Sequence, residues 1–336
     1  MNNLSFYNNN PNDLQLLEDY LNSNSIHYEK DVELKKKTWI HRGGKCAIFI
    51  TPTDSDTLLQ VSQYLYANNI GFLVVGHTSN IYITNECNID VVLNTVRCNK
   101  FEILDNTIVC ECGASVSNMA KEMTKKGVAG FEHLHELPGT VAGAIHNNSS
   151  CLSNSISSLL VSATIVKEDG TVSEMSYDDF HFRYRTSIMK DKTLKGVIIK
   201  AKLKVTQGNA DELEQIAAKT NARRKVNLEG NAKNLGCTVN RTFCNGRMPL
   251  QYLIPSRIHD FCIKFKEKDA LIRKKKHKDF LCKIAGYSHI SKYISNKSMI
   301  TFMWIDEGAD SAFPDYLEFM KKVFKTDHVE IEVIRN

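Results

Sequence analysis

The sequence contains few of the features that mark exported, membrane-spanning or metal-binding proteins. Its first residues, MNNLSFYNNNPND, include no basic segment followed by an apolar one, and no run approaches the roughly 20 apolar residues that a membrane span needs. The ten cysteines include no CxxC pair, so reduced thiols are expected rather than disulfides. Cys110 and Cys112 could chelate a metal, but their spacing suits two buried thiols on one face of a strand. These absences predict a cytoplasmic protein without membrane insertion and with no metal site.

Signals for nucleic-acid binding are also few. The net charge of +5 is modest, and much of the basic excess lies in one segment, IKFKEKDALIRKKKHK, from Ile263 to Lys278. No aromatic stacking platform or recognition motif accompanies it, so a solvated helix face is the favoured interpretation. A positive field would also favour an anionic substrate. The sequence therefore predicts no nucleic-acid partner.

The composition is that of an ordinary soluble globular protein. With 336 residues, 42% hydrophobic and 24% charged, the chain is long enough for two or three domains with their own cores. We expect a monomer. The segment Met1 to Lys37 is polar apart from one helical stretch, Asp13 to Leu21, and is interpreted as an extension before the core domain.

Backbone-permissive residues gather in one stretch, GFEHLHELPGTVAGAIHNNSS, from Gly130 to Ser150. It combines a turn at Pro138-Gly139 with the small residues of Thr140 to Ala144, which let main chain approach a ligand and leave backbone N–H groups available to bind it. The alternative is a plain turn that leads into a tightly packed helix, and the stretch alone does not decide between the two.

A family resemblance favours the ligand site. PGTVAGAI followed by Asn148 resembles the PGTVGGAxxxNAG stretch of the UDP-N-acetylenolpyruvoylglucosamine reductase (MurB) family, in its shorter subtype without an extra substrate loop; Ser149-Ser150 replace Ala-Gly. The resemblance implies an α+β protein with an FAD-binding fold of the vanillyl-alcohol-oxidase type, built from two α/β subdomains, and a C-terminal substrate-binding domain. The implied boundaries are 1–37 for the extension, 38–205 for the FAD domain (subdomains about 38–97 and 98–205) and 206–336 for the substrate domain.

Three further motifs carry the resemblance through the FAD domain. TWIHRGGKCA at Thr38 to Ala47 is similar to TxxRxGGxA, GHTSN at Gly76 to Asn80 is similar to GxGSN, and Gly113-Ala114 follows a strand as in the family. Thr78 stands where a second Gly is usual, and a β-branched residue resists φ > 0, so this loop is expected either to keep φ < 0 or to hold phosphate less closely. The cofactor-binding residues implied for FAD are Arg42, Gly43, Gly44, Gly76, His77, Thr78, Ser79, Asn80, Gly113, Ala114, Pro138, Gly139, Thr140, Gly143, Ala144 and Asn148.

Periodicity predicts the elements that hold these motifs. The expected strands are 47–50, 70–75, 91–93, 100–104, 107–112, 161–166, 170–174, 196–204, 299–305 and 329–333, and the expected helices are 54–68, 117–126, 177–180, 211–224 and 314–324. The first helix and the strands around it make a β-α-β unit.

Three residues are the catalytic ones that the resemblance implies. FRYRTS at Phe182 to Ser187 is similar to FxYRxS, whose arginine, here Arg185, faces the substrate carboxylate; a structural salt bridge is the alternative. Cys237 stands where the family has a proton-donating serine, and a thiol can serve as the acid, although a buried inert cysteine is the alternative. In VEIEV, similar to LExEV, the second acid is Glu332, and alternation puts Glu330 on the same side; two solvated acids are the alternative.

The resemblance also implies the reaction. NADPH would reduce the bound FAD, which would then reduce an enolpyruvyl ether on a UDP-sugar to UDP-N-acetylmuramate for peptidoglycan, with Tyr184, Lys225 and Arg241 binding substrate. Between Arg241 and Lys278 no motif of the family is found, so a related flavoenzyme with another enolpyruvyl or sugar-nucleotide substrate remains open. A flavin- or nucleotide-binding relative without activity is the third reading.

Overall fold

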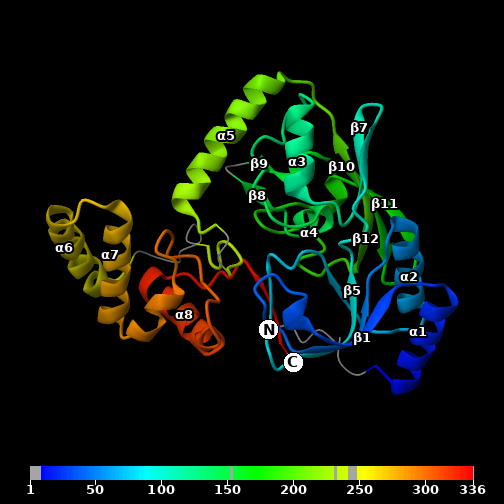
Figure 1. The fold of residues 1–336 in the computed structure, drawn as a ribbon, viewed down its shortest axis with the longest axis horizontal. Helices are drawn as coiled ribbons and strands as arrows, with labels where there is room; N and C mark the ends of the chain where they lie inside the picture. Colours follow the sequence, from blue (N-terminus) through cyan, green and yellow to red (C-terminus); the bar gives the residue numbers. More distant parts are fainter. Residues whose placement is uncertain (1–8, 152–153, 231–232, 241–247, 336) are drawn as a thin grey trace.

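The structure is a computed structural model that describes residues 9–151, 154–230, 233–240 and 248–335. Two β-sheets with their helices form one body, and a helical C-terminal part lies beside it (Figure 1). The α-helices are α1 Pro11–Ser23, α2 Ser55–Ala67, α3 Val116–Lys125, α4 Val141–His146, α5 Ala210–Asn227, α6 Leu250–Lys266, α7 Ala270–Ala285 and α8 Gly308–Phe324. Short 3-10 helices are η1 Leu34–Lys36, η2 Ile156–Ser158, η3 Asp178–Phe180 and η4 Ser288–Tyr293.

The strands fall into two main sheets and two short pairs. One sheet has the order β1-β2-β5-β3, the other β11-β10-β12-β7-β6, and β13 pairs with β4 and β8 with β9. The strands are β1 Tyr28–Glu33, β2 Lys45–Ile50, β3 Leu73–Val75, β4 Ile81–Ile83, β5 Asn88–Asn94, β6 Phe101–Leu104, β7 Thr107–Glu111, β8 Ser150–Cys151, β9 Asn154–Ser155, β10 Leu160–Lys167, β11 Val172–Ser176, β12 Gly196–Lys204 and β13 Glu332–Ile334.

The first sheet is built on the predicted β-α-β unit. β2 and β3 both run parallel to β5, which lies between them, and α2 makes the crossover. Asp54 caps α2 by accepting a hydrogen bond from the Thr57 N–H at 2.8 Å, a contact that stabilises a helix by about 1 kcal/mol. Leu58, Val61 and Leu65 of α2 are fully buried against the sheet core. The unit leaves the loop after β3, Gly76 to Asn80, at the carboxyl end of the parallel strands, where ligands bind in open α/β sheets.

The N-terminal segment is integrated into this sheet. β1 pairs antiparallel with β2, and α1 buries Leu17 and Leu21 completely in the core shared with α2. Tyr20 of α1 also stacks on Tyr64 of α2, with ring centroids 3.7 Å apart. The packing thus places residues 11–36 with the first sheet, whereas the sequence predicted an extension outside it.

The second sheet is antiparallel and shares its core with the first. Ile48 and Ile50 of β2 belong to the same buried cluster as Ala163 and Ile165 of β10. α3 and α4 follow β7 and precede β10, and Figure 1 shows both beside this sheet. The predicted strand 196–204 is confirmed as β12, which pairs with both β10 and β7.

Aromatic side chains form a separate core in the C-terminal part. Trp304, Phe302 and Tyr316 are fully buried there, and Phe302 lies 4.9 Å from Trp304 between ring centroids. The prediction of a strand at 299–305 is wrong, because this segment forms only single bridges, Phe302 with Ile294 and Met303 with Asn234. The conformation of this segment is set by the burial of its consecutive side chains from Thr301 to Trp304, and not by strand pairing.

The end of the chain returns to the first body. β13 pairs parallel with β4, so that Glu332 lies opposite Ile81. Asp310 at the start of α8 reinforces the junction, since its carboxylate contacts Arg42 Nε at 3.0 Å and the Tyr82 hydroxyl at 2.9 Å. In the predicted strand 329–333, only Glu332 and Val333 are in the strand observed.

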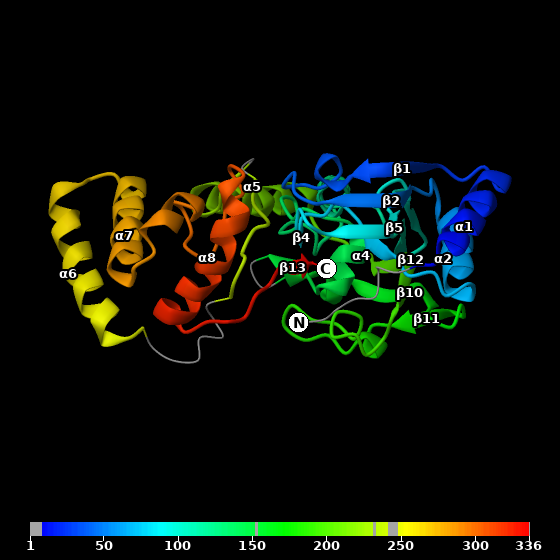
Figure 2. The same cartoon turned by 90° about the horizontal axis from the view of Figure 1, so that it is seen from below.

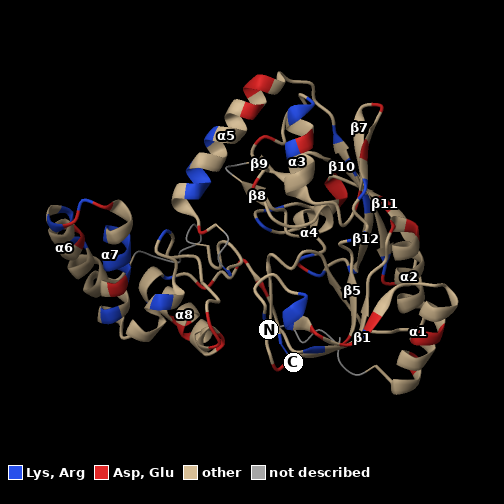
Figure 3. Cartoon of the chain, viewed as in Figure 1, with Lys and Arg blue, Asp and Glu red and all other residues tan. Residues whose placement is uncertain are grey.

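Helices α6 and α7 form a hairpin that projects from the rest of the molecule (Figure 2). The basic segment from 263 to 278 covers the end of α6 and much of α7, where Figure 3 shows the blue Lys and Arg ribbon. Its lysines are exposed except Lys278, whose ammonium donates to the Ile294 carbonyl at 2.9 Å and the Asn296 side chain at 2.7 Å. Burial lowers the pKa of Lys278.

No helix of the described residues has the length and apolar content needed to cross a bilayer.

Candidate active site

A cavity of about 910 Å³ lies where the two sheets and the returning C-terminus meet. It extends from β3 and the start of β12 to the α4 region and β13. Among the residues that line it are Gly76, His77, Thr78, Ser79, Asn80, Ile81, Pro138, Gly139, Thr140, Ala142, Gly143, Ala144, His146, Asn147, Ser149, Met189, Lys190, Gly196, Val197, Ile198, Glu332, Val333 and Ile334.

The loop after β3 presents backbone donors to this cavity. In the part of the chain that the structure describes, the N–H groups of His77 to Asn80 make no hydrogen bond. Successive N–H groups around a left-handed residue form a concave anion site, and a phosphate is the anion that such loops bind. The loop therefore has the chemistry that the FAD pyrophosphate needs.

Thr78 adopts the conformation that its side chain disfavours. Its φ is +55°, so the first of the two expected alternatives, φ < 0, is wrong, and the second, a less close hold on phosphate, stays a prediction. The side chain is buried, and its hydroxyl accepts the Trp39 backbone N–H at 2.8 Å. This bond offsets part of the steric cost, about 1–2 kcal/mol, of a left-handed residue that carries a Cβ. The loop thus keeps the shape that glycine would give it.

Substitutions at Thr78 should separate strain from hydrogen bonding. Thr78→Val keeps the β-branched strain and removes the acceptor, so we expect it to lower the free energy of unfolding by about 1–3 kcal/mol. Thr78→Gly removes both strain and acceptor and should change the free energy of unfolding by less than about 1 kcal/mol. Urea denaturation measures both, with Thr78→Ser as the control that keeps the acceptor. If the Val and Gly variants lost the same free energy of unfolding, the strain at Thr78 would make no measurable contribution to stability.

Thr140 and the glycines beside it shape the opposite wall. Gly139 has φ +118°, and a Cβ there would meet Ser79 Oγ at 3.2 Å, so the Pro138-Gly139 turn packs directly on the loop after β3. A Cβ on Gly76 would lie 2.5 Å from Thr140 Oγ1. Thr140 caps α4 by accepting the Gly143 N–H at 3.2 Å. The Thr140 side chain thus occupies the space that a Cβ on Gly76 would need, and the positive φ of Gly139 favours glycine there as well.

An unpaired amide supports the fit of FAD to this cavity. Asn147 lines the cavity at the end of α4, and its buried Oδ1 has no hydrogen-bond partner among the described residues. A buried acceptor left in this way has a ligand or water as its natural partner. Together with the N–H groups of the loop after β3, it gives the cavity polar groups of the kind that a flavin nucleotide requires.

Several predicted cofactor residues lie outside the cavity. Arg42 is paired with Asp310, and the glycines of its motif pack on neighbouring chain: a Cβ on Gly44 would lie 2.0 Å from the Cys87 carbonyl. Asn148 donates to the Arg183 carbonyl at 2.9 Å, and its neighbour Asn147 takes the lining position. The residues that the structure does not bring to the cavity are Arg42, Gly43, Gly44, Gly113, Ala114 and Asn148.

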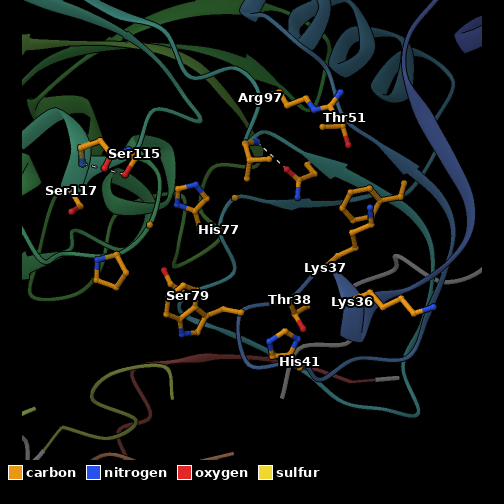
Figure 4. Close-up of a pocket in the computed structure, with 18 of the residues that line it drawn as sticks. Lys36, Lys37, Thr38, His41, Thr51, His77, Ser79, Arg97, Ser115 and Ser117 are labelled. Atoms are coloured by element: carbon orange, nitrogen blue, oxygen red, sulfur yellow. Dashed lines mark hydrogen bonds between the residues drawn. The ribbon is translucent and has the colours of Figure 1, made fainter. Parts of the chain in front are cut away.

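A second cavity of about 950 Å³ lies on the other side of the loop after β3 and shares Gly76, His77 and Ser79 with the first. Figure 4 shows His77 inside it, with Lys36 and Lys37 on one side and Ser115 and Ser117 on the other. Burial lowers the pKa of His77, which favours its neutral form. Basic side chains thus lie near the candidate phosphate loop on this side as well.

Arg185 lies at the junction of the first body and the C-terminal segment. Its backbone is left-handed, with φ +53°, and its Nη2 donates to the Ser150 carbonyl at 3.2 Å. Its Nε lies 3.9 Å from a carboxylate oxygen of Glu330, beyond hydrogen-bond distance, and has no hydrogen-bond partner among the described residues. The guanidinium therefore has a buried donor left for a substrate carboxylate.

The two glutamates near the C-terminus, Glu330 and Glu332, have different partners. Glu330 is buried and accepts the Tyr184 hydroxyl at 3.2 Å on the oxygen that does not face Arg185. Glu332 is half-buried, lines the cavity, and lies 3.5 Å from His146 Nδ1. Sequence reasoning selected Glu332 for chemistry and did not foresee the contact of Glu330 with Arg185.

Lys190 is a cavity residue that sequence reasoning missed. Its ammonium lies 3.5 Å from the Glu330 carbonyl. Burial lowers its pKa, the charges of Glu332 and Glu330 oppose that shift, and Arg185 adds to it. No motif in the sequence marks this position, because Lys190 lies three residues beyond the end of the FRYRTS motif at Ser187. Its position gives the site a second cation beside both glutamates.

The lowered pKa of Lys190 predicts a pH dependence of stability. The unfolded chain holds this proton at higher pH than the folded protein, so the free energy of unfolding should rise as pH increases through the window between the lowered pKa and the ordinary value of 10.5. Lys190→Met removes this contribution. Urea unfolding should show that the free energy of unfolding of wild type, relative to Lys190→Met, is larger at pH 10 than at pH 8. The exposed Lys283→Met control should show no such pH-dependent difference from wild type. A constant difference between wild type and Lys190→Met would contradict the prediction.

Cys237 lies near the same charges. It is half-buried, and burial raises the pKa of its thiol; Glu330 raises it further, whereas Arg185 and Arg224 lower it. The thiol is therefore protonated at neutral pH, as a proton donor must be. Of the predicted substrate residues, Tyr184 contacts Glu330, Lys225 is exposed in the last turn of α5, and Arg241 lies outside the described residues.

Comparisons with known proteins find similarity in both the sequence and the fold. The family model described as "FAD binding domain" matches residues 46–176. The chain is 27% identical over 203 residues to the UDP-N-acetylenolpyruvoylglucosamine reductase of Caldicellulosiruptor saccharolyticus, covering 60% of this chain and 65% of that one. It is 30% identical over 177 residues to the enzyme of Caldicellulosiruptor bescii, covering 53% and 56%. The crystal structure of the Thermus caldophilus enzyme superposes with a TM-score of 0.66 at 17% identity, covering 92% of this chain and 100% of that one.

The fold and the cavity define an α+β flavoprotein with an FAD-binding domain and a mainly helical C-terminal part, so the predicted α+β class with an FAD-binding fold is confirmed. Over 53–60% of its length the chain is similar in sequence to UDP-N-acetylenolpyruvoylglucosamine reductases (MurB), and it shares the fold of one of them. Its alignments span less than two thirds of the length of the first curated relatives. The activity of the whole protein is therefore a proposal.

Proposed function

We propose that this protein reduces the enolpyruvyl ether of UDP-N-acetylglucosamine enolpyruvate with NADPH, forming UDP-N-acetylmuramate for peptidoglycan synthesis. The observation that carries the proposal is the cluster of Arg185, Lys190, Glu330, Glu332 and Cys237 beside a cavity suited to FAD. Bound FAD would accept a hydride from NADPH and supply it to the terminal enolpyruvyl carbon.

The side chains of this cluster then act on the substrate. Arg185 binds the carboxylate through its unpaired Nε, where negative charge grows as the double bond is reduced. The Cys237 thiol gives its proton to the carbon next to the carboxylate and recovers one from solvent. Glu332 stabilises the enol form from the cavity wall, while Glu330 positions Arg185 and Tyr184. The UDP part is bound by the C-terminal side, with Lys225 and Arg241 as its cationic partners.

Two half-reactions test the proposal. NADPH should bleach the flavin of the purified protein under anaerobic conditions, and UDP-N-acetylglucosamine enolpyruvate should restore its absorbance with formation of UDP-N-acetylmuramate. NADH serves as the comparison donor. A flavin that NADPH reduces but this substrate leaves reduced would contradict the proposed substrate.

One observation favours a related activity on another enolpyruvyl or sugar-nucleotide compound. The stretch from Arg241 to Lys278 was expected to hold the sugar-nucleotide pocket. Its described part forms helix α6 and part of α7. None of these described residues lines either cavity. A panel of enolpyruvyl compounds in the reoxidation assay separates the two. A protein that binds no flavin, and so lacks colour, would instead support the inactive relative.

A further inference from the structure

Helix α6 has two apolar faces. One is buried: Tyr252, Ser256 and Ile263 are 5%, 4% and 8% exposed, and α6 packs on α7. The other is open to solvent. Its large side chains are more than half exposed, with fractions of 67% for Leu250, 54% for Ile254, 59% for Ile258, 63% for Phe261 and 76% for Phe265.

The exposed side chains form one narrow stripe, which we call the α6 stripe and define as Leu250, Ile254, Ile258, Phe261 and Phe265. Their spacing of four, four, three and four residues keeps them within roughly a quarter of the helix circumference at 3.6 residues per turn. By the same arithmetic the face packed on α7 lies on the opposite side of the helix. A stripe this narrow has the width of a helix-to-helix seam rather than of the broad apolar half of a membrane-surface helix.

Nothing in the described chain covers the stripe. α6 is the outermost element of the projecting hairpin, with α7 between it and α8 (Figures 1 and 2). Five such side chains, each more than half exposed, present on the order of 600 Å² of apolar surface, the upper limit of the largest patch on a typical monomer. Two such stripes together would bury on the order of 1,200 Å², enough for a specific interface.

We propose that two copies of this chain associate through the α6 stripe, with the two α6 helices antiparallel about a two-fold axis. The stripe positions are nearly symmetric about a point between Arg257 and Ile258: two pairs of positions are related by this point, and Ile258 lies half a residue from it. In this register Leu250 meets Phe265 of the second copy, Ile254 meets Phe261, and the two Ile258 side chains meet near the axis. Each large residue thus opposes a smaller one, as a packed helix pair requires.

Arg257 borders the stripe, about 20° from Leu250 around the helix. Asp260 lies about 80° from Leu250, toward the face packed on α7, and pairs with Lys264 of the same helix at 3.4 Å. In the antiparallel register the two Arg257 side chains lie near each other on one flank of the axis, so their repulsion weakens the pair and added salt should strengthen the dimer. The proposed dimer is an alternative to the monomer predicted from the sequence, which stays a prediction.

Sedimentation velocity over a range of full-length protein concentrations tests the association. We expect wild type to form a dimer and Ile258→Asp to raise the dimer dissociation constant by about 100-fold or more, because each copy would bury an unpaired carboxylate. The matched control is Leu16→Asp, since Leu16 of α1 is 57% exposed and lies on another surface. A monomeric wild type at every concentration, or equal loss of dimer in both variants, would overturn the proposal.

Two further variants test the register. Arg257→Gln, which removes the like charges that meet at the axis, should strengthen the dimer, whereas Asp260→Asn, on the side that faces α7, should leave it unchanged. In a chain with Cys244 and Cys262 replaced by serine, Ile258→Cys should give a disulfide-linked dimer on mild oxidation, whereas Leu16→Cys should not. Binding of monomeric protein to anionic phospholipid vesicles through α6, without dimer formation, would assign the stripe to a membrane surface and overturn the dimer.

Discussion

Arg185→Lys should slow flavin reoxidation by substrate by about 10²- to 10³-fold, the loss expected when one charged donor to a developing anion is removed. FAD content and flavin reduction by NADPH should stay as in wild type. The guanidinium is held by the Ser150 carbonyl through Nη2 while its Nε keeps a buried, unpaired N–H group. An ammonium is a single point of charge and cannot keep the Ser150 contact and a substrate contact in the same geometry.

Rapid-mixing measurements of the two half-reactions check this result. The matched control is Arg183→Lys, because Arg183 lies two residues earlier, is mostly exposed and pairs with Asp191 at 2.6 Å. The control should change neither half-reaction. If Arg185→Lys slowed flavin reduction as much as reoxidation, Arg185 would act on the flavin or on the fold rather than on the substrate.

Cys237→Ala should leave flavin reduction intact and slow flavin reoxidation by about 10²- to 10⁴-fold, the contribution of a positioned general acid. Cys237→Ser should recover much of the rate, because a hydroxyl can carry the same proton. Burial keeps the thiol protonated, and Arg185 and Arg224 moderate that effect. The residue is thus an acid in the correct protonation state beside the other charged groups of the site.

A purely structural Cys237 predicts another outcome. Loss of a small buried thiol costs about 1 kcal/mol of stability and leaves the rate unchanged. Cys282→Ala is the control, since Cys282 is fully buried in the aromatic core of the C-terminal part, away from the cavity. A Cys237→Ala variant that reoxidises at the wild-type rate would remove the acid from the mechanism.

Sequence patterns predicted the elements whose side chains alternate between core and solvent or carry a cap. α2 begins after Asp54 as expected, and β12 spans the residues predicted. β1 escaped prediction because YEKDVE buries only Val32; its place is set by backbone pairing with β2. The segment 299–305 was wrongly predicted as a strand. Its apolar run reflects burial in the aromatic core and not strand pairing.

The candidate site was predictable where a motif fixes a backbone shape and less so where side chains meet. Gly139 and Thr140 lie where the motif indicated. Thr78 departs from its steric preference because the Trp39 N–H and the surrounding loop hold it there. The contacts that join Glu330 to Arg185 and Tyr184 depend on the approach of distant segments, which no spacing in one sequence encodes.

The pairing of β13 with β4 has a consequence for how the site responds to its ligands. Three residues of parallel ladder attach Glu332 to the first body, whereas both main sheets are complete without it. Undocking of this short strand would open the site while the rest of the fold stays intact, a local opening of the kind that hydrogen exchange detects. The cavity has walls on both sides of this seam, at Ile81 and at Val333. A cofactor bound across it shifts the docking equilibrium by mass action, so amide protection of β13 should increase with FAD occupancy while protection of β12 stays unchanged.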